Sequence, residues 1–281
     1  MPGPNITLYT GQSPNGVKIS ITLEELGLPY TVREVNMKVN EQKSDWFAEI
    51  NPNGRIPAIT DTFDDGETIR VFESGSIMQY LVARYDTEHK ISYPVGTREH
   101  VEVKPTTSSG TSNWSVEGFS ERHPRFQASA SPRDHSIFIP TVETPTDSST
   151  HYFSYAKDDH EYAATRYQNE VKRLYGVLDK HLRDVGSDYI VGSKMTIADI
   201  AHWGWITLSR WAKVELSDFP TLKAWEERVL ARPAVEKGRH VPDKHHREIL
   251  QDPKMMEEFE KRGKAFYRQK EKEAAEEKAH A

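Results

Sequence analysis

Short apolar runs of strand type alternate with amphipathic runs of helix type through the N-terminal third of the chain. The pattern predicts strands at residues 6–9, 30–35, 58–61 and 68–72. It predicts helices at residues 17–26, 45–50 and 74–85. The resulting order is βαβαββα. The first βαβ unit is expected to be a right-handed parallel crossover, and the Asp64-Asp65-Gly66 turn makes the last two strands a hairpin.

Two of these helices differ in how firmly the pattern defines them. Periodicity alone leaves residues 17–26 open between strand and helix, and the ending at Gly27 favours helix because glycine is a common helix stop. Residues 74–85 form a clearer helix, which Ser74 is expected to cap. Its apolar stripe consists of Ile77, Met78, Leu81, Val82 and Tyr85.

Only helix patterns appear in the C-terminal half. Apolar residues three or four apart predict a long helix at 158–183. Thr196 and Asp199 form a predicted capping box, from which a helix runs to about Ser209. A further helix is expected from Pro220 to about Ala231, ended by Pro233. The tryptophans of this half are expected to pack in the core, namely Trp203, Trp205 and Trp211.

Two segments depart from these patterns. About half of residues 104–150 are Ser, Thr or Pro without a sustained period, a composition that favours disorder. A real insertion that replaces a helix and a gene-model artefact, such as a retained intron or shifted frame, both explain this segment. Residues 251–279 are highly charged, and Glu257 and Lys261 stand at helical spacing, which predicts an exposed helix.

Composition and charge exclude several classes of function. The 281 residues suggest roughly two domains. With 37 Lys and Arg against 43 Asp and Glu, the net charge of -6 provides no basic field for nucleic acid. The count of 0 cysteines excludes disulfides, cysteine-ligated zinc and a cysteine nucleophile. We find no apolar run long enough for a membrane span and no secretion signal, so a cytoplasmic location is expected. His245 and His246 stand among charged residues and are expected to be exposed, so no metal site is predicted.

Three short motifs carry candidate chemistry. Ser13-Pro14-Asn15-Gly16 lies where a strand meets a helix, and its hydroxyl and amide are placed to stabilise an anion there. Ile56-Pro57 precedes a strand, where proline often makes a rigid and sometimes cis turn. Glu73-Ser74 begins the helix at 74–85, where a hydroxyl and backbone N–H groups form a carboxylate site. Taken singly, the first two are also typical of ordinary turns and loops.

Together, in this order and spacing, the three motifs resemble those of the glutathione-transferase family. The resemblance covers residues 6–103 and about 151–240. It implies an α/β thioredoxin-like N-terminal domain plus an all-α C-terminal domain. The corresponding boundaries are 1–87 for the first domain, 95–240 for the helical domain interrupted by the irregular 104–150 segment, and 241–281 for a charged helical tail.

The second half resembles one subgroup of that family in particular. This subgroup contains the fungal nitrogen-catabolite regulator and the bacterial nu-class enzymes. Its likeness rests on residues 166–170, 173–179 and 196–199. The Ser13-Pro14-Asn15 turn also fits, because the subgroup tends to have Thr or Ser, then Pro, then Asn at that turn.

The resemblance also implies a ligand and roles for individual residues. Glutathione would be the co-substrate, and Ser13 and Asn15 would face its sulfur. A cis Ile56–Pro57 bond would present the Ile56 backbone to the cysteinyl part. The remaining implied contacts are Glu73 and Ser74 at the γ-glutamyl end, with Gln42 and Arg55 elsewhere on the ligand. Donors near the sulfur are needed because a free thiol of pKa ~8.5 is mostly protonated at neutral pH, and hydrogen bonds to the thiolate lower that pKa.

The implied activity is attack of the glutathione thiolate on a small electrophile or a disulfide. The alternative is a non-catalytic regulatory or interaction protein that keeps the fold. The nitrogen-catabolite regulator carries a long Asn/Gln-rich N-terminal arm, whereas the first strand here begins at Ile6, which favours the enzyme. A homodimer fits the resemblance, but the 104–150 segment weakens that expectation. In the family, that stretch helps to shape the second-substrate pocket and the dimer interface.

Overall fold

A computed structural model gives the structure of the chain and describes residues 4–108 and 161–252, with a few further positions between 254 and 265. One sheet contains four strands in the order β2-β1-β3-β4. These strands are β1 (Ile6–Thr10), β2 (Tyr30–Glu34), β3 (Ala58–Thr62) and β4 (Thr68–Phe72). The β1–β2 pair is parallel, whereas β1–β3 and β3–β4 are antiparallel. The predicted βαβαββα order and strand directions are therefore confirmed.

The helices among these strands are α1 (Pro14–Leu26), α2 (Asp45–Ala48) and α3 (Ser74–Tyr85), with short 3₁₀ turns η1 (Met37–Val39) and η2 (Glu41–Lys43). Residues 17–26, ambiguous by pattern, are helical. Gly27 ends α1 at φ 67°, and its N–H donates to the carbonyl of Glu24. Because such a left-handed conformation favours glycine, the stop signal was the decisive one.

The start of α3 corrects the prediction that Ser74 caps this helix. Glu73 is the N-cap residue, with φ 67° and ψ 117°, and its side chain makes no capping hydrogen bond. Ser74 is the first helical residue. Because β4 ends at Phe72 and α3 begins at Ser74, Glu73 alone makes the change of direction from strand to helix. Its backbone therefore adopts a positive φ, which is uncommon for a residue other than glycine. The prediction had placed the cap one residue later, at Ser74.

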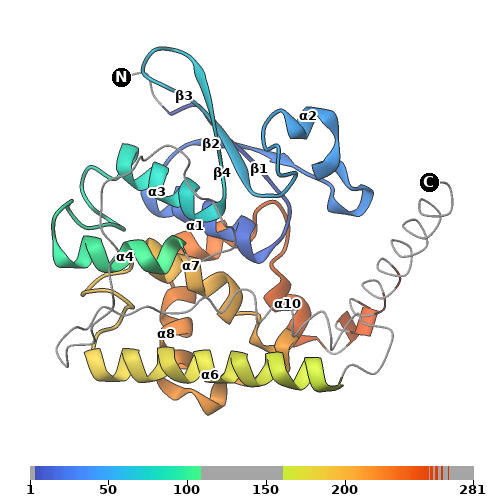
Figure 1. Cartoon of the computed structure of the whole chain (residues 1–281), viewed down its shortest axis with the longest axis vertical. Helices are drawn as coiled ribbons and strands as arrows, with labels where there is room; N and C mark the ends of the chain where they lie inside the picture. The colour runs from blue at the N-terminus through green and yellow to red at the C-terminus, as the bar shows by residue number, and fades with distance from the viewer. Residues whose placement is uncertain are drawn as a thin grey trace, which may run out of the picture.

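All elements described beyond residue 97 are helical. They are α4 (Arg98–Ser108), α6 (Glu161–Val185), α7 (Ile197–Ile206), α8 (Pro220–Leu230), α9 (Pro233–Gly238) and α10 (His246–Gln251), with 3₁₀ turns η3 (Ser209–Ala212) and η4 (Leu216–Asp218). Figure 1 shows the sheet with α1 and α3 at one end of the molecule and α6 at the other, with α7 and α8 between them. The predicted capping box of α7 is present, since the Thr196 N–H donates to Asp199 Oδ2 at 2.8 Å.

The boundaries that differ from their predictions include those of α4 and α9. Helix α4 runs to Ser108 and so enters the segment predicted to be irregular from residue 104. Thr97 Oγ1 accepts the His100 N–H at 3.2 Å and Val103 is buried, so this helix starts with a cap and an apolar anchor. The rest of that segment, 109–150, and most of the predicted tail helix lie outside the described residues. Pro233 begins α9 instead of only ending α8, because proline suits the first position of a helix.

One apolar core joins the two halves of the chain. Helix α1 lies at its centre and packs against α3, α7 and α9. Trp203, Trp205 and Trp211 are all buried, which confirms their predicted place in the core. The core thus fixes the first turn of α1, at one end of the sheet, against α7 of the helical half.

His245 contradicts the prediction that the histidine pair is exposed. It is only 1% exposed and stacks on Trp203, with ring centroids 5.6 Å apart. His246 is half-buried beside Trp211. Burial lowers the pKa of His245 to about 3 and that of His246 to about 4, so both rings are neutral at pH 7. Neutral imidazoles pack against aromatic rings as apolar side chains do. The charged residues on either side in the sequence gave no sign of this burial.

Across the described residues, no helix has the length and apolar character needed to cross a bilayer. Those same residues include no group of three or more His, Asp or Glu side chains arranged to hold a metal ion.

Candidate functional site

The register of the sheet brings the three sequence motifs to one edge. Ala58, the first residue of β3, pairs with Tyr9 on β1 and with Phe72 on β4. Both pairings are antiparallel, so the residues that precede Ala58 lie beside those that follow Tyr9 and Phe72. Pro57 therefore meets the turn that leads into α1 on one side and Glu73 on the other.

Direct contacts tie the three motifs together. A side chain at Gly11 would place its Cβ 3.3 Å from Ile56 Cδ1 and 3.1 Å from the Val35 carbonyl, so glycine permits this close approach. Asn53 Nδ2 donates to Glu73 Oε1 at 3.3 Å. The loop before β3 thus touches both the α1 turn and the start of α3.

The first turn of α1 carries the two residues predicted to face a sulfur. Ser13 is the N-cap, and its Oγ accepts the Gly16 N–H at 3.0 Å. That bond uses the hydroxyl as an acceptor and leaves its O–H as a donor. Asn15 Oδ1 accepts the indole N–H of Trp205 at 3.2 Å. Both side chains are half-buried at the sheet edge.

The Ile56–Pro57 peptide bond is cis, as expected. A buried residue that sequence reasoning missed, Asn51, shapes the loop before it. Asn51 Nδ2 donates to the Arg55 carbonyl at 2.7 Å, and its Oδ1 accepts the Asn53 N–H at 3.0 Å. The Asn-Pro-Asn-Gly sequence carried the signal, because asparagine side chains bond to backbone two residues further on.

Gln42 and Arg55, predicted as further contacts, differ in their surroundings. Gln42 is buried, and a Cβ on Gly54 would lie 2.9 Å from its carbonyl, which places it under the loop. Its Oε1 is buried and accepts no hydrogen bond from the described part of the chain. A buried acceptor without a donor calls for an explanation, and a bound ligand would supply one. The Arg55 side chain is exposed at the rim and forms no ion pair with any described residue.

The start of α3 is open to an anion. Glu73 is held at φ 67°, a conformation that costs about 1–3 kcal/mol and clusters at functional sites. The first N–H groups of any helix lack partners within the helix, and here the N-cap side chain supplies none. Together with the Ser74 hydroxyl, these groups suit a carboxylate.

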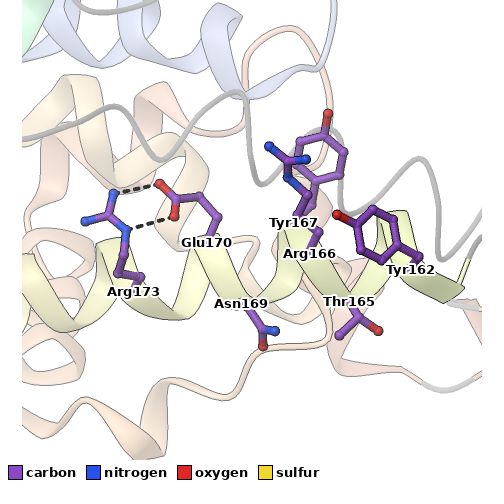
Figure 2. Close-up of a pocket in the computed structure, with 7 residues that line it drawn as sticks. All are labelled: Tyr162, Thr165, Arg166, Tyr167, Asn169, Glu170 and Arg173. Carbon is purple, nitrogen blue, oxygen red and sulfur yellow. Dashed lines mark hydrogen bonds and ion pairs between the residues drawn. The ribbon is translucent and has the colours of Figure 1, made fainter.

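A separate hollow of about 1050 Å³ lies along one face of α6 (Figure 2). Its lining includes none of the predicted site residues and consists of Tyr162, Thr165, Arg166, Tyr167, Asn169, Glu170 and Arg173. Arg173 bonds to both carboxylate oxygens of Glu170, at 2.6 and 2.8 Å, and thereby lowers the pKa of Glu170. In Figure 2, Arg166 and Tyr167 point to the same side of the helix and Asn169 to the other. Every side chain that lines it carries a polar group.

Comparisons with known proteins agree with this geometry. Residues 12–84 match the family described as glutathione S-transferase, N-terminal domain, and residues 146–237 match glutathione S-transferase, C-terminal domain. The glutathione S-transferase-like protein tpcF of Aspergillus fumigatus is 33% identical over 83% of this chain and 94% of its own length. The disulfide-bond oxidoreductase YfcG of Escherichia coli is 33% identical over 82% of this chain and 92% of its own length.

A solved structure extends the likeness to the fold over most of the chain. The crystal structure of a glutathione transferase homolog from Lodderomyces elongisporus, with two GSH per subunit, matches with a TM-score of 0.69. It is 35% identical and covers 85% of this chain and 99% of that one. With its three motifs joined at one sheet edge and relatives at this level of identity over most of its length, the chain belongs to the glutathione S-transferase family.

Proposed function

We propose that this protein is a glutathione transferase, in which the thiolate of bound glutathione attacks a small electrophile or a disulfide. The observation that carries the proposal is the meeting of three features at one sheet edge. These are the donor turn of α1, the loop with the cis Ile56–Pro57 bond, and the open start of α3. A thiol that arrives with its own carboxylate and peptide groups suits all three.

The proposed binding roles follow from the chemistry of each group. The start of α3 offers the Ser74 hydroxyl and unpaired backbone N–H groups to the γ-glutamyl carboxylate. The Ile56 backbone pairs with the cysteinyl part. The buried Gln42 Oε1 is an acceptor ready for a ligand N–H, and the exposed Arg55 is a cation at the rim.

The proposed chemistry depends on lowering the pKa of the glutathione thiol. Ser13 keeps an O–H donor. The Asn15 oxygen accepts the Trp205 indole N–H, and Asn15 carries its N–H donors on the amide nitrogen. The positive end of the α1 dipole also favours an anion at this turn. Hydrogen bonds to the thiolate stabilise it relative to the thiol, which raises the nucleophile's concentration at neutral pH.

A disulfide substrate would react by the same nucleophile. The glutathione thiolate attacks one sulfur of the substrate, a glutathione mixed disulfide forms, and the other sulfur leaves as a thiolate. A second glutathione then releases glutathione disulfide and the second substrate thiolate. With 0 cysteines, the chain supplies no thiol of its own, so both thiols come from glutathione. The relatives named for transferase and disulfide-oxidoreductase activity favour an enzyme over the non-catalytic regulator.

The proposal extends to the subgroup and setting of the enzyme. The Ser13-Pro14-Asn15 turn and the sequence of α6 support a place in the subgroup with the fungal nitrogen-catabolite regulator and the nu-class enzymes. We infer a cytoplasmic detoxifying enzyme of fungal type, organised as the domains 1–87 and 95–240 with the tail 241–281. A homodimer fits the same proposal.

Isothermal titration of glutathione into the full chain tests this function. Ser74→Ala is expected to weaken binding by about 1–3 kcal/mol, roughly 5- to 150-fold, because a carboxylate loses a charge-assisted donor. Ser76→Ala, on the exposed side of the same helix, is the matched control and should bind as the wild type does. Equal affinity in Ser74→Ala and the wild type, or no binding by the wild type, would contradict the proposal.

A further inference from the structure

The residue before the N-cap of α1 ties the donor turn to a distant part of the chain. Gln12 donates through Nε2 to the carbonyl of Arg239 at 3.1 Å and also to the carbonyl of Asp243. These acceptors stand 227 and 231 positions further along the chain. Because a side-chain amide nitrogen carries two N–H groups, the two carbonyls match its donor capacity in full. The joint so formed lies directly beside Ser13, whose hydroxyl is proposed to face the sulfur.

The two carbonyls belong to a segment that is itself anchored. Gly238, the last residue of α9, lies against α1, where its added Cβ would come within 2.7 Å of Ile21 Cα. Ser20 Oγ donates to the Gly238 carbonyl at 2.7 Å. The guanidinium of Arg239 bonds to both carboxylate oxygens of Glu236, at 2.7 and 3.0 Å. The acceptors are therefore held in place by α9, and Gln12 is fixed by them.

The joint contains buried polar atoms that stability alone does not explain. With Nε2 facing two carbonyls, Gln12 Oε1 lies at the other end of the amide, where it is buried and accepts no hydrogen bond from the described residues. Arg239 is 8% exposed, and its Nη1 is a buried donor that also lacks an acceptor in the described part of the chain. Unsatisfied buried atoms are uncommon, and such departures concentrate at functional sites. An apolar side chain at residue 12 would avoid the first of them, so the amide points to a positioning role.

We propose that Gln12 is a positioning residue that holds Ser13 in place for the sulfur of bound glutathione. The inference rests on the proposed function and adds the segment 239–243 to the support of the sulfur site. In this role Gln12 acts through Ser13 and makes no bond to the reacting atoms. On the other side of Ser13, α7 holds Pro14, since a Cβ on Gly204 would lie 2.5 Å from the Pro14 carbonyl. When the Gln12 side is released, Ser13 can shift, and its hydrogen bond to the thiolate weakens as distance and angle depart from their optimum.

The test compares pH–rate profiles of the full chain with an aryl halide at saturating glutathione. Gln12→Met keeps the length of the side chain and removes both bonds, and it is expected to raise the pH midpoint of kcat/KM by up to about one unit. Gln168→Met is the matched control, because Gln168 Nε2 donates to the Lys213 carbonyl at 2.8 Å, and its midpoint should stay at the wild-type value. In a Ser13→Ala background, Gln12→Met should add no further shift, because the residue it positions is gone.

A second variant, Gln12→Asn, keeps an amide that is one methylene too short to reach both carbonyls, and it should shift the pH midpoint in the same direction. If Gln12 only stabilised the fold, its variants would lower the denaturant midpoint of unfolding and leave the pH midpoint unchanged. Three results would overturn the inference: an unchanged pH midpoint in either Gln12 variant, an equal shift in Gln168→Met, or additive shifts with Ser13→Ala. These outcomes differ from failure of the proposed function, in which the wild type does not bind glutathione by calorimetry.

Discussion

Helices α1 and α3 begin at the same edge of the sheet, yet their N-termini are capped differently. The α1 turn is capped by Ser13, which accepts the Gly16 N–H, and it is bonded to the helical half through Asn15 and Gln12. The N-cap of α3, Glu73, makes no capping hydrogen bond and holds a left-handed backbone. In the first turn of α3, the N-cap side chain thus accepts none of the backbone N–H groups. In the first turn of α1, Ser13 accepts one backbone N–H, and hydrogen bonds hold the side chains of Gln12 and Asn15.

This difference teaches a division of work between the two helix ends. An uncapped end offers several N–H groups to a carboxylate and so contributes affinity. A capped and anchored end holds a few side-chain donors in fixed directions, which suits the stabilisation of one sulfur anion. We therefore expect changes at α3 to alter glutathione affinity, as the Ser74→Ala titration tests, and changes at α1 to alter the pKa of the thiol.

The largest of the remaining effects is on stability, and it concerns the segment with Asp243 and His245, which anchors α1 but not α3. Gln12 bonds to the Asp243 carbonyl, close to the buried His245. Burial, with the nearby cations Arg239 and Arg247, lowers the pKa of His245 to about 3, whereas the unfolded chain has about 6.5. The unfolded state therefore binds the proton first as pH falls. Stability is full above about pH 6.5 and declines below it, by about 2 kcal/mol at pH 5.

Thermal unfolding at pH 7.5 and pH 5 checks this expectation. The midpoint of the wild type should fall further than that of His245→Phe, which keeps a ring against Trp203 and does not titrate there. Parallel falls in the two proteins would show that His245 does not set the acid sensitivity of this anchor.

The next effect is on activation at the α1 turn. Asn15→Ala removes one donor to the thiolate and should raise the thiol pKa by about one unit, or about 1.4 kcal/mol. Activity with an aryl halide or a small disulfide should then fall up to about tenfold at neutral pH and recover at alkaline pH, where glutathione ionises unaided. A pH–rate profile identical to that of the wild type would mean that backbone N–H groups alone stabilise the thiolate.

The smallest effect separates the two roles of Ser13. Ser13→Ala removes the α1 cap and should lower the free energy of unfolding by about 1 kcal/mol. Ser13→Asn keeps a capping oxygen and should retain most of that stability while changing the donor near the sulfur. Denaturant unfolding of the three proteins measures the difference. Equal stability of Ser13→Ala and the wild type would show that the Gly16 N–H needs no cap.

Local signals predicted the elements that place the site. Gly27 resolved α1 as a helix because its left-handed conformation is a property of one residue. The Thr196–Asp199 capping box of α7 was equally local. The α3 start was displaced by one residue, to Glu73, because the pattern located the helix but not the residue that turns the chain out of β4.

Contacts between distant parts of the chain could not be predicted in the same way. The Trp205–Asn15 bond joins residues 190 positions apart, and nothing in either local sequence names the other. His245 is surrounded by charged residues in sequence but by Trp203 and its neighbours in space. Both contacts depend on how segments distant in sequence pack together, which local sequence patterns do not specify.

The division of work between the two helix ends is tested most directly by the thiolate absorbance of bound glutathione, followed across pH at saturating ligand. Asn15→Ala should raise the pKa of the bound thiol by about one unit with little change in affinity. Ser74→Ala should weaken affinity roughly 5- to 150-fold and leave that pKa at its wild-type value. If both variants shift both quantities alike, or if Ser74→Ala raises the pKa and Asn15→Ala does not, α1 and α3 do not divide the work in this way.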